Sequence, residues 1–240
     1  MTGINLKNER ELTLMREAGR IVAQVLARVR ETVVPGMTTG DIEALAEQII
    51  VREHKAIPSF KGYRGYPSLI CTSVNDEIVH GIPGKRVLNQ GDIVGVDVGV
   101  IYRGYQGDGA ITVAVGQVDP ESQRLMDVTV EALRCGIEAS RPGNWTSDIS
   151  RAIQEYVEGQ GYTVVREYTG HGIGRQMHED PQIPNYGVAG RGLLLKPGMV
   201  LAIEPKLVYE NAFSAGMESV VRVTDSGHRL LTRTPVEVST

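Results

Sequence analysis

Cysteine is scarce in this sequence. Cys71 and Cys135 are its only two cysteines, and they lie far apart in the chain. This spacing does not fit a zinc knuckle, a dithiol redox pair or a disulfide framework, each of which needs closely paired or more numerous cysteines. We therefore expect a protein of the reducing cytoplasm.

Long apolar runs are also absent. The N-terminal segment, residues 1–11, is polar and has no apolar core of the kind found in signal peptides. No later stretch approaches the ~20 apolar residues that a membrane-spanning helix requires. The sequence predicts a soluble, unexported protein without a membrane partner.

An excess of positive charge is missing as well. Lysine and arginine total 25 against 29 acidic residues, which gives a formal net charge of -4, and the basic residues are scattered. Nucleic-acid-binding proteins concentrate basic side chains on one face or in one run. We therefore expect no specific nucleic-acid partner.

What remains is the composition of a globular protein. The hydrophobic fraction of 41% is enough for a sizeable core, and with 22% charged residues it argues against disorder. Apolar residues from Leu12 to Val29 recur at helical spacing behind Asn8, a candidate N-cap, with Glu11 three residues further on. Pro35-Gly36 ends this helix, and Thr39 is expected to cap a second one.

A helix-break-helix pattern occurs twice. Pro142-Gly143 lies 107 residues after Pro35-Gly36, and residues 198–204 follow residues 91–97 at the same offset of 107. The sequence therefore predicts a single α+β domain, residues 1–240, that is internally duplicated. Its halves, roughly residues 8–115 and 120–225, would meet about a pseudo-twofold axis in an antiparallel sheet covered by helices, with a site between them.

Each half contains a short apolar strand that ends in a carboxylate. Asp97 and Asp108 flank a turn-like stretch at residues 102–105, and Glu204 and Glu218 flank a polar one at residues 210–211. If each stretch folds as a hairpin, the two carboxylates of a pair oppose each other across the strands. Four carboxylates would then converge between the halves.

Carboxylates among valines need compensation for their charge. Desolvation and mutual repulsion are relieved by protonation, by basic partners or by bound cations. We expect no lysine or arginine beside these four groups, which favours cations. A single acidic residue near a turn is more often a solvated surface group. A single histidine such as His171, which lies between glycines, is ordinarily no metal ligand. The four carboxylates and His171 taken together nevertheless favour a metal site.

Taken together, these motifs resemble the methionine aminopeptidases, in their bacterial type without an N-terminal extension. The resemblance covers nearly the whole chain and rests on five stretches. They are residues 80–83 (HGIP), 91–108 with Asp97 and Asp108, 170–181 (GHGIGRQMHEDP), 196–205 (KPGMVLAIEP), and Glu218. It implies the pita-bread fold and one catalytic domain.

The resemblance also implies a function and a set of site residues. The activity would be removal of the initiator methionine from nascent polypeptides, with a small second residue preferred. Two divalent ions of cobalt, manganese, iron or zinc would be bound by Asp97, Asp108, His171, Glu204 and Glu218. Glu204 would move the proton, His178 would stabilise the oxyanion, and His80 would contact the scissile amide or the second residue. Tyr63, Tyr66, Cys71 and Met177, with Phe60, would form the methionine pocket. The ribosome is a further partner that this function admits, and a monomer is expected.

Two departures from the family pattern bear on specificity. Gly109-Ala110 follows Asp108 where the family commonly has a hydroxyl residue, and the short segment between Glu204 and Glu218 has no tryptophan. Two alternatives remain: a prolidase or aminopeptidase P on the same fold, which usually carries an extra N-terminal domain, and a non-catalytic binding module, which tends to have lost ligands.

Overall fold

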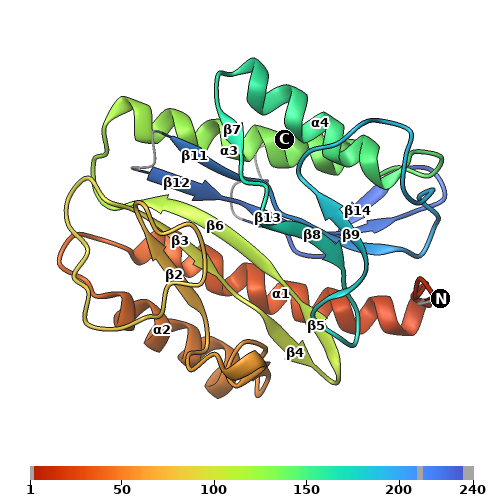
Figure 1. The fold of residues 1–240 in the computed structure, drawn as a ribbon. Helices are drawn as coiled ribbons and strands as arrows, with labels where there is room; N and C mark the ends of the chain where they lie inside the picture. Colours follow the sequence, from red (N-terminus) through yellow and green to blue (C-terminus); the bar gives the residue numbers. More distant parts are fainter. Residues whose placement is uncertain (1–2, 210–212, 235–240) are drawn as a thin grey trace.

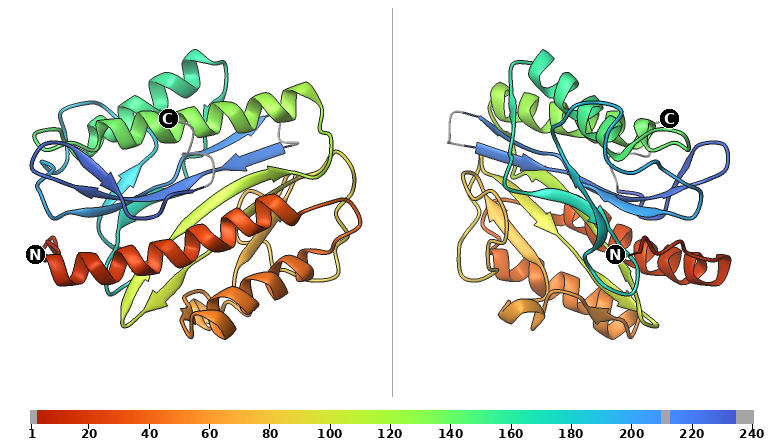
Figure 2. Two further views of the ribbon diagram at one scale, coloured as in Figure 1. Left: turned by 180° about the vertical axis from the view of Figure 1, so that it is seen from behind. Right: turned by 45° about the vertical axis from the view of Figure 1, so that its right-hand side comes forward.

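A computed structural model of the protein describes residues 3–209 and 213–234. Within these described ranges, four α-helices lie in two pairs (Figures 1 and 2). They are α1 (Glu9–Thr32) with α2 (Thr39–Glu47), which continues as a π-helical turn (Gln48–Glu53), and α3 (Pro120–Ala139) with α4 (Thr146–Gly159). Among the described residues, no helix is long and apolar enough to cross a membrane.

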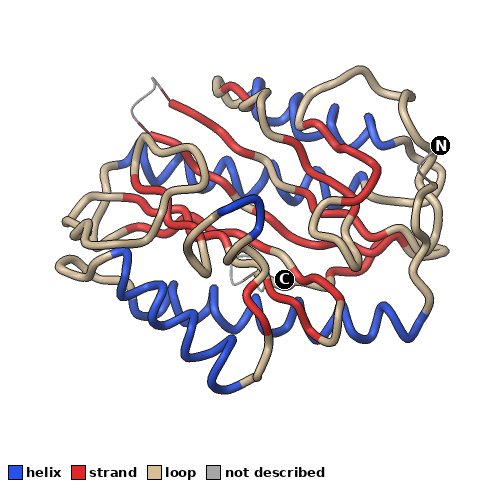
Figure 3. The backbone as a smooth tube through the Cα atoms, turned by 60° about the horizontal axis from the view of Figure 1, so that its bottom comes forward, coloured by secondary structure: helices blue, strands red, loops and turns tan. Residues whose placement is uncertain are grey.

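An eight-stranded sheet forms the centre of the molecule (Figure 3). Its strand order is β2 (Cys71–Val74), β3 (Ile93–Asp97), β6 (Gly109–Ala114), β13 (Glu218–Val223), β10 (Val200–Ile203), β8 (Thr169–Gly172) and β9 (Glu179–Pro184), with β14 (His228–Leu230) paired to β13. Two small sheets flank it. One consists of β1 (Ile57–Pro58), β4 (Val100–Tyr102) and β5 (Tyr105–Gly107), and the other of β12 (Phe213–Gly216), β11 (Lys206–Tyr209) and β7 (Thr163–Val164).

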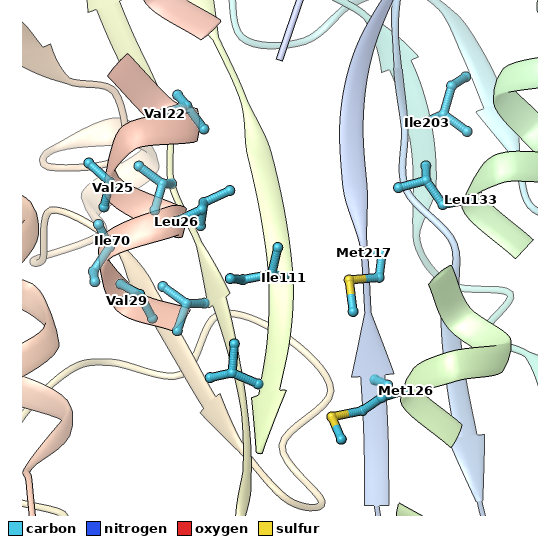
Figure 4. Close-up of a cluster of buried hydrophobic side chains, with 14 of the residues drawn as sticks. Val22, Val25, Leu26, Val29, Ile70, Ile111, Met126, Leu133, Ile203 and Met217 are labelled. Carbon is cyan, nitrogen blue, oxygen red and sulfur yellow. The ribbon is translucent and has the colours of Figure 1, made fainter. Parts of the chain in front are cut away.

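The core lies between this sheet and the helices. From α1, Val22, Val25 and Leu26 pack in the same buried cluster as Ile111 of β6, and from α3, Leu133 packs with Ile203 of β10 (Figure 4). Along β3, the valines of alternate positions are fully buried in this core, because successive side chains of a strand point to opposite faces. Asp97 therefore points away from the helices.

The duplication is visible in matching local contacts. The backbone N–H of Thr38 donates to Asp41 Oδ2 at 2.7 Å, and that of Trp145 donates to Asp148 Oδ2 at 2.6 Å. The N-caps are thus Thr38 and Trp145, one residue before the expected Thr39 and its counterpart. Both caps also form an isolated antiparallel bridge, Thr38 with Val87 and Trp145 with Leu194. The antiparallel α+β fold of the prediction is confirmed; the boundaries of the halves stay a prediction.

The hairpin registers agree with the sequence in one half and differ in the other. Ile203 pairs with Ser219 and Lys206 with Gly216, so Glu204 lies opposite Glu218 as expected; the loop at residues 210–212 is outside the described residues. In the first hairpin Asp97 faces Ala110, not Asp108. The expected opposition of the two aspartates is wrong, because the turn is centred on Arg103-Gly104, one residue beyond the midpoint between them, and both turn residues have positive φ.

Gly19 allows α1 to approach the C-terminal segment closely. A Cβ at this position would lie 2.3 Å from the carbonyl oxygen of Leu231. Gly19→Ala is therefore expected to lower the free energy of unfolding by about 1–3 kcal/mol through overpacking, although alanine is the better helix former by roughly 1 kcal/mol. Urea unfolding measures the change. The control is Gly159→Ala at the end of α4, where the space is open and no loss is expected; equal stability of the two variants would contradict the prediction.

Candidate metal centre

Both halves of the chain contribute to one cavity of about 680 Å³ on the face of the sheet opposite the core valines. All of the site residues predicted from the sequence line it. They are Phe60, Tyr63, Tyr66, Cys71, His80, Asp97, Asp108, His171, Met177, His178, Glu204 and Glu218. The cavity also has lining residues that the sequence had not indicated, including Arg64, Tyr168 and Lys206.

The sheet register explains how the acidic groups meet. Ala110 of β6 is paired with Asp97 on one side and with Glu218 on the other, so these three side chains stand in one row on the cavity face. Asp108 precedes Ala110 by two residues and reaches the same face from the strand end. The small side chain of Ala110 leaves the space above the row to the carboxylates.

A histidine joins this row from the neighbouring strands. His171 of β8 pairs with Ala202 of β10, two residues before Glu204. Its Nδ1 lies 2.9 Å from the carbonyl oxygen of Gly172, while Nε2 lies 3.5 Å from Glu204 Oε1 and 3.9 Å from Asp108 Oδ2. A backbone acceptor on one ring nitrogen orients the other nitrogen, as is usual for metal-ligating histidines.

Asp108, His171 and Glu218 form a compact potential ligand group. One ligand atom from each lies within 4.8 Å of the others, and all three side chains are buried. Oδ1 of Asp97 and Oε1 of Glu218 are buried without a hydrogen-bond partner. One imidazole and several carboxylates suit divalent ions of the first transition row. The residues present therefore fit a divalent metal site.

The electrostatics of the centre agree with this fit. Burial raises the pKa of Asp97 to about 7, although Lys206 opposes part of the rise. Burial and the neighbouring carboxylates Asp97 and Glu204 hold the pKa of Asp108 well above its usual range, and burial and Asp108 do the same for the pKa of Glu218. Such shifts are expected where several carboxylates lie close together in a buried site.

Lys206 contradicts the expectation that no basic residue accompanies the carboxylates. Its Nζ donates to Glu204 Oε2 at 2.8 Å, and only 7% of its side chain is exposed. Burial disfavours the ammonium form, but the attraction of Glu204, Glu218 and Asp97 outweighs burial and raises the pKa of Lys206. The alternation of strand side chains could have indicated this residue, because Lys206 follows Glu204 by two positions and so shares its face.

His178 lies at the mouth of the centre beside Tyr63. Nδ1 of His178 and the Tyr63 hydroxyl are 2.9 Å apart, and the His178 ring centroid is 4.3 Å from that of His171. Burial against the cavity wall, followed by the charge of His171, lowers the pKa of His178 to about 4, so its ring is neutral at pH 7. In the tautomer in which Tyr63 donates to Nδ1, Nε2 carries the ring proton and is a potential donor.

The other predicted substrate contacts lie around the same opening. His80 has a positive φ of 60° and meets the edge of Tyr168, with 5.8 Å between the ring centroids. The Tyr66 hydroxyl donates to the carbonyl oxygens of Ile70 and Gly81 at 3.1 and 2.9 Å, which fixes its ring in the wall. Met177 is buried, and Cys71 pairs with Asp97 across β2 and β3.

Gly99 has no side chain, and this leaves space for the apolar wall formed by Met177 and Phe60. A Cβ at Gly99 would lie 2.7 Å from both Met177 Cε and Phe60 Cε1. Met177 and Phe60 therefore pack directly over the backbone that follows Asp97. The wall brings apolar side chains next to the carboxylates, an arrangement that suits a substrate with an apolar side chain beside its reacting group.

Comparisons with known proteins agree with this geometry. The model of metallopeptidase family M24 matches residues 13–225. The methionine aminopeptidase of Clostridium acetobutylicum is 47% identical, over 95% of this chain and 98% of that protein. The crystal structure of methionine aminopeptidase from Thermotoga maritima superposes with a TM-score of 0.93 at 42% identity, over 96% of this chain and 100% of that one.

A more distant similarity concerns the fold alone. Prolidase from Pyrococcus furiosus superposes with a TM-score of 0.82 at 24% identity, and the match covers 95% of this chain and 65% of the prolidase. The pita-bread architecture is thus shared with enzymes of both kinds, whereas the sequence similarity is far higher to the first. The chain belongs to metallopeptidase family M24, among its methionine aminopeptidases.

Proposed function

We propose that this protein is a metal-dependent aminopeptidase that hydrolyses the N-terminal methionine from nascent polypeptides. The observation that carries the proposal is the buried group of Asp108, His171 and Glu218 beside an apolar wall that contains Met177. The relatives named methionine aminopeptidase support it over nearly the full chain. Cys71 and Cys135 are unpaired, which is consistent with work in the reducing cytoplasm.

The metal is a divalent ion of manganese, iron, cobalt or zinc, for which the donor set is suited. Asp97, Asp108, His171, Glu204 and Glu218 are the proposed ligands, and as a set they offer enough donors for the two ions that the family resemblance implies. When bound, such an ion acts as a Lewis acid on the scissile carbonyl and lowers the pKa of a coordinated water toward ~7.

Side chains of the protein carry out the proton transfer, the stabilisation of the oxyanion and the positioning of the substrate. Glu204 accepts a proton from the attacking water and delivers it to the amine that leaves when the C–N bond breaks. Its carboxylate is held for this task by Lys206 at 2.8 Å. Nε2–H of neutral His178 donates to the carbonyl oxygen as negative charge develops there. His80, which also lines the cavity, contacts the scissile amide or the second residue.

The wall of the methionine pocket is expected to set the preference for the first residue of the substrate. Wild-type protein is expected to cleave Met-Ala-Ser in preference to Leu-Ala-Ser and to Xaa-Pro peptides. Met177→Ala should reduce kcat/KM for Met-Ala-Ser by about 10–200-fold, since one lost apolar contact is worth ~1–3 kcal/mol. Preference among first residues should weaken in parallel. The measurement is kcat/KM over a series of Met-Xaa-Ser and Xaa-Ala-Ser peptides.

Met126→Ala provides the matched control. Met126 is a buried methionine of α3 on the far side of the sheet, 5% exposed, whereas Met177 is 3% exposed. Its truncation should lower thermal stability and leave the peptide preference as in wild type. Faster cleavage of Leu-Ala-Ser or of an Xaa-Pro peptide by the wild-type protein would overturn the methionine specificity while leaving the metal chemistry in place.

A further inference from the structure

The loop between β8 and β9 carries two of the groups that the proposed function uses. It spans residues 173–178 and ends with Met177 of the apolar wall and His178, the proposed donor to the oxyanion. A donor of this kind must be held within about 0.5 Å of its productive position by the residues that support it. The contacts that hold this loop therefore bear on catalysis.

Glu179, the first residue of β9, holds the backbone of this loop. Its Oε1 accepts from the backbone N–H of Arg175 at 2.9 Å and from that of Gln176 at 3.2 Å. Gly174 leaves the space for the carboxylate, since a Cβ there would lie 2.5 Å from Oε1. The carboxylate thus fixes the loop just ahead of its two site residues.

Lys7 binds the other oxygen of this carboxylate from the N-terminal segment. Its Nζ donates to Glu179 Oε2 at 2.6 Å and to the carbonyl oxygen of Asn5 at 2.8 Å. The side chains of Lys7 and Glu179 are only 6% and 8% exposed. Burial raises the pKa of Glu179, but the hydrogen bond and charge of Lys7 and the backbone N–H donors outweigh it and lower the pKa. The pair is therefore a buried link between two ionised groups.

The N-terminal segment is itself fixed to the rest of the protein. The backbone N–H of Lys7 donates to the carbonyl oxygen of Gly198 at 2.9 Å, and Asn8 directly after it caps α1. The ammonium group therefore has little freedom to follow the loop if the loop moves. An ion pair between two anchored segments favours one position of the loop.

We propose that the ion pair of Lys7 and Glu179 is a positioning device for the active site, which holds the loop between β8 and β9 so that His178 can donate to the substrate carbonyl. The proposal rests on the metal-dependent function above. Neither Lys7 nor Glu179 lines the cavity of the metal centre, so both are positioning residues that act through His178.

The kinetic test compares wild type, Lys7→Met, His178→Ala and the double variant of the two substitutions. Lys7→Met should lower kcat for Met-Ala-Ser by about 10–100-fold with little change in KM or bound metal, because misplacement by about 1 Å can cost a factor of 10². In the His178→Ala background the same substitution should have little further effect, since the positioned group is already absent. Lys7→Arg keeps a cation beside Glu179 and should lose less than Lys7→Met.

A second readout does not depend on cleavage. The protein has five histidines, so NMR spectra of Zn²⁺-loaded protein labelled with isotope-enriched histidine contain few ring signals. The signal of His178 is the one that disappears in His178→Ala. In Lys7→Met this signal should shift or broaden, whereas those of His54 and His228 should stay in place.

Arg222→Met is the matched control. Arg222 of β13 pairs with Glu9 at 2.6 Å and also ties the start of α1 to the sheet, but this pair involves no residue of the loop between β8 and β9. Its loss should leave kcat and the His178 signal as in wild type. Circular dichroism melts establish that each variant is folded. If Lys7→Met does not fold because Glu179 is left buried and unpaired, the double variant Lys7→Met/Glu179→Gln, which leaves no lone charge, takes its place.

The outcomes distinguish this inference from the proposed function. An equal loss of kcat on Lys7→Met in the wild-type and His178→Ala backgrounds would overturn the inference, and so would an unmoved His178 signal in folded Lys7→Met. If wild-type protein does not cleave methionine peptides, the proposed substrate is rejected, and the NMR comparison still decides whether Lys7 positions His178.

Discussion

Asp108→Asn and Glu218→Gln are each expected to abolish peptide hydrolysis, with kcat/KM reduced at least about 1,000-fold. Each substitution removes an anionic donor from the compact group that these residues form with His171. Metal chemistry is worth several kcal/mol to the transition state, and ~1.4 kcal/mol corresponds to a tenfold change in rate. Purified variants should retain little metal by elemental analysis after dialysis.

The thermal stability of these two variants is expected to be retained although their activity is lost. Because burial and neighbouring carboxylates raise the pKa values of Asp108 and Glu218, their ionised forms repel one another in the metal-free protein. The neutral amides relieve this repulsion, so the metal-free variants should melt at or above the temperature of metal-free wild type at pH 7. Added Mn²⁺ should stabilise wild type and have little effect on the variants. A variant that keeps its metal and turns over normally would contradict the assignment of these residues as ligands.

His178→Ala is expected to lower kcat by about 10²–10³-fold with little change in metal content. A donor to the developing oxyanion acts mainly on the transition state, so its loss appears in kcat and in kcat/KM to the same extent. Nδ1 of His178 lies 2.9 Å from the Tyr63 hydroxyl and the ring is neutral, so in the proposed role Nε2–H would be the donor to the substrate. Steady-state kinetics with Met-Ala-Ser, alongside elemental analysis, measure both quantities.

His54→Ala is the matched control for this experiment. His54 follows the π-helical turn and bonds through Nε2 to Gln24 at 2.8 Å, away from the cavity. Its loss should leave kcat unchanged. If His178→Ala loses bound metal, His178 is itself a ligand and the division of roles between it and His171 is wrong.

Much of the fold was predictable because its determinants are local. The capping box at Asn8 and Glu11 and the alternation of valines around Asp97 each act within a few residues. Because the sequence pattern repeats at an offset of 107 residues, the local features recognised in one half also predicted those of the other half. The cap of the second helix was off by one residue, since threonines occupy both 38 and 39 and each can serve as a cap.

Register was harder to predict than strand identity. The spacing of Asp97 and Asp108 is compatible with a turn centred midway between them, but the structure centres it one residue later and pairs Asp97 with Ala110. The position of the turn sets this register, and side-chain packing on the two faces of the sheet selects the turn position, because a shift of register changes which side chains meet. The choice between alternative strand registers therefore depends on contacts between residues that lie far apart in the chain.

The sequence by itself determined the antiparallel α+β fold and the repeat, because periodicity and turn chemistry are properties of the chain, and its motifs identified twelve of the residues that line the cavity but not Arg64, Tyr168 or Lys206. Only the tertiary structure decided how those residues meet. It brought Tyr63 to His178 across 115 positions, separated Asp97 from the compact ligand group, and turned Lys206 inward onto Glu204. Charge balance at a buried site depends on distances in space, so a lysine that reads as an ordinary strand residue becomes part of the centre once the sheets have formed.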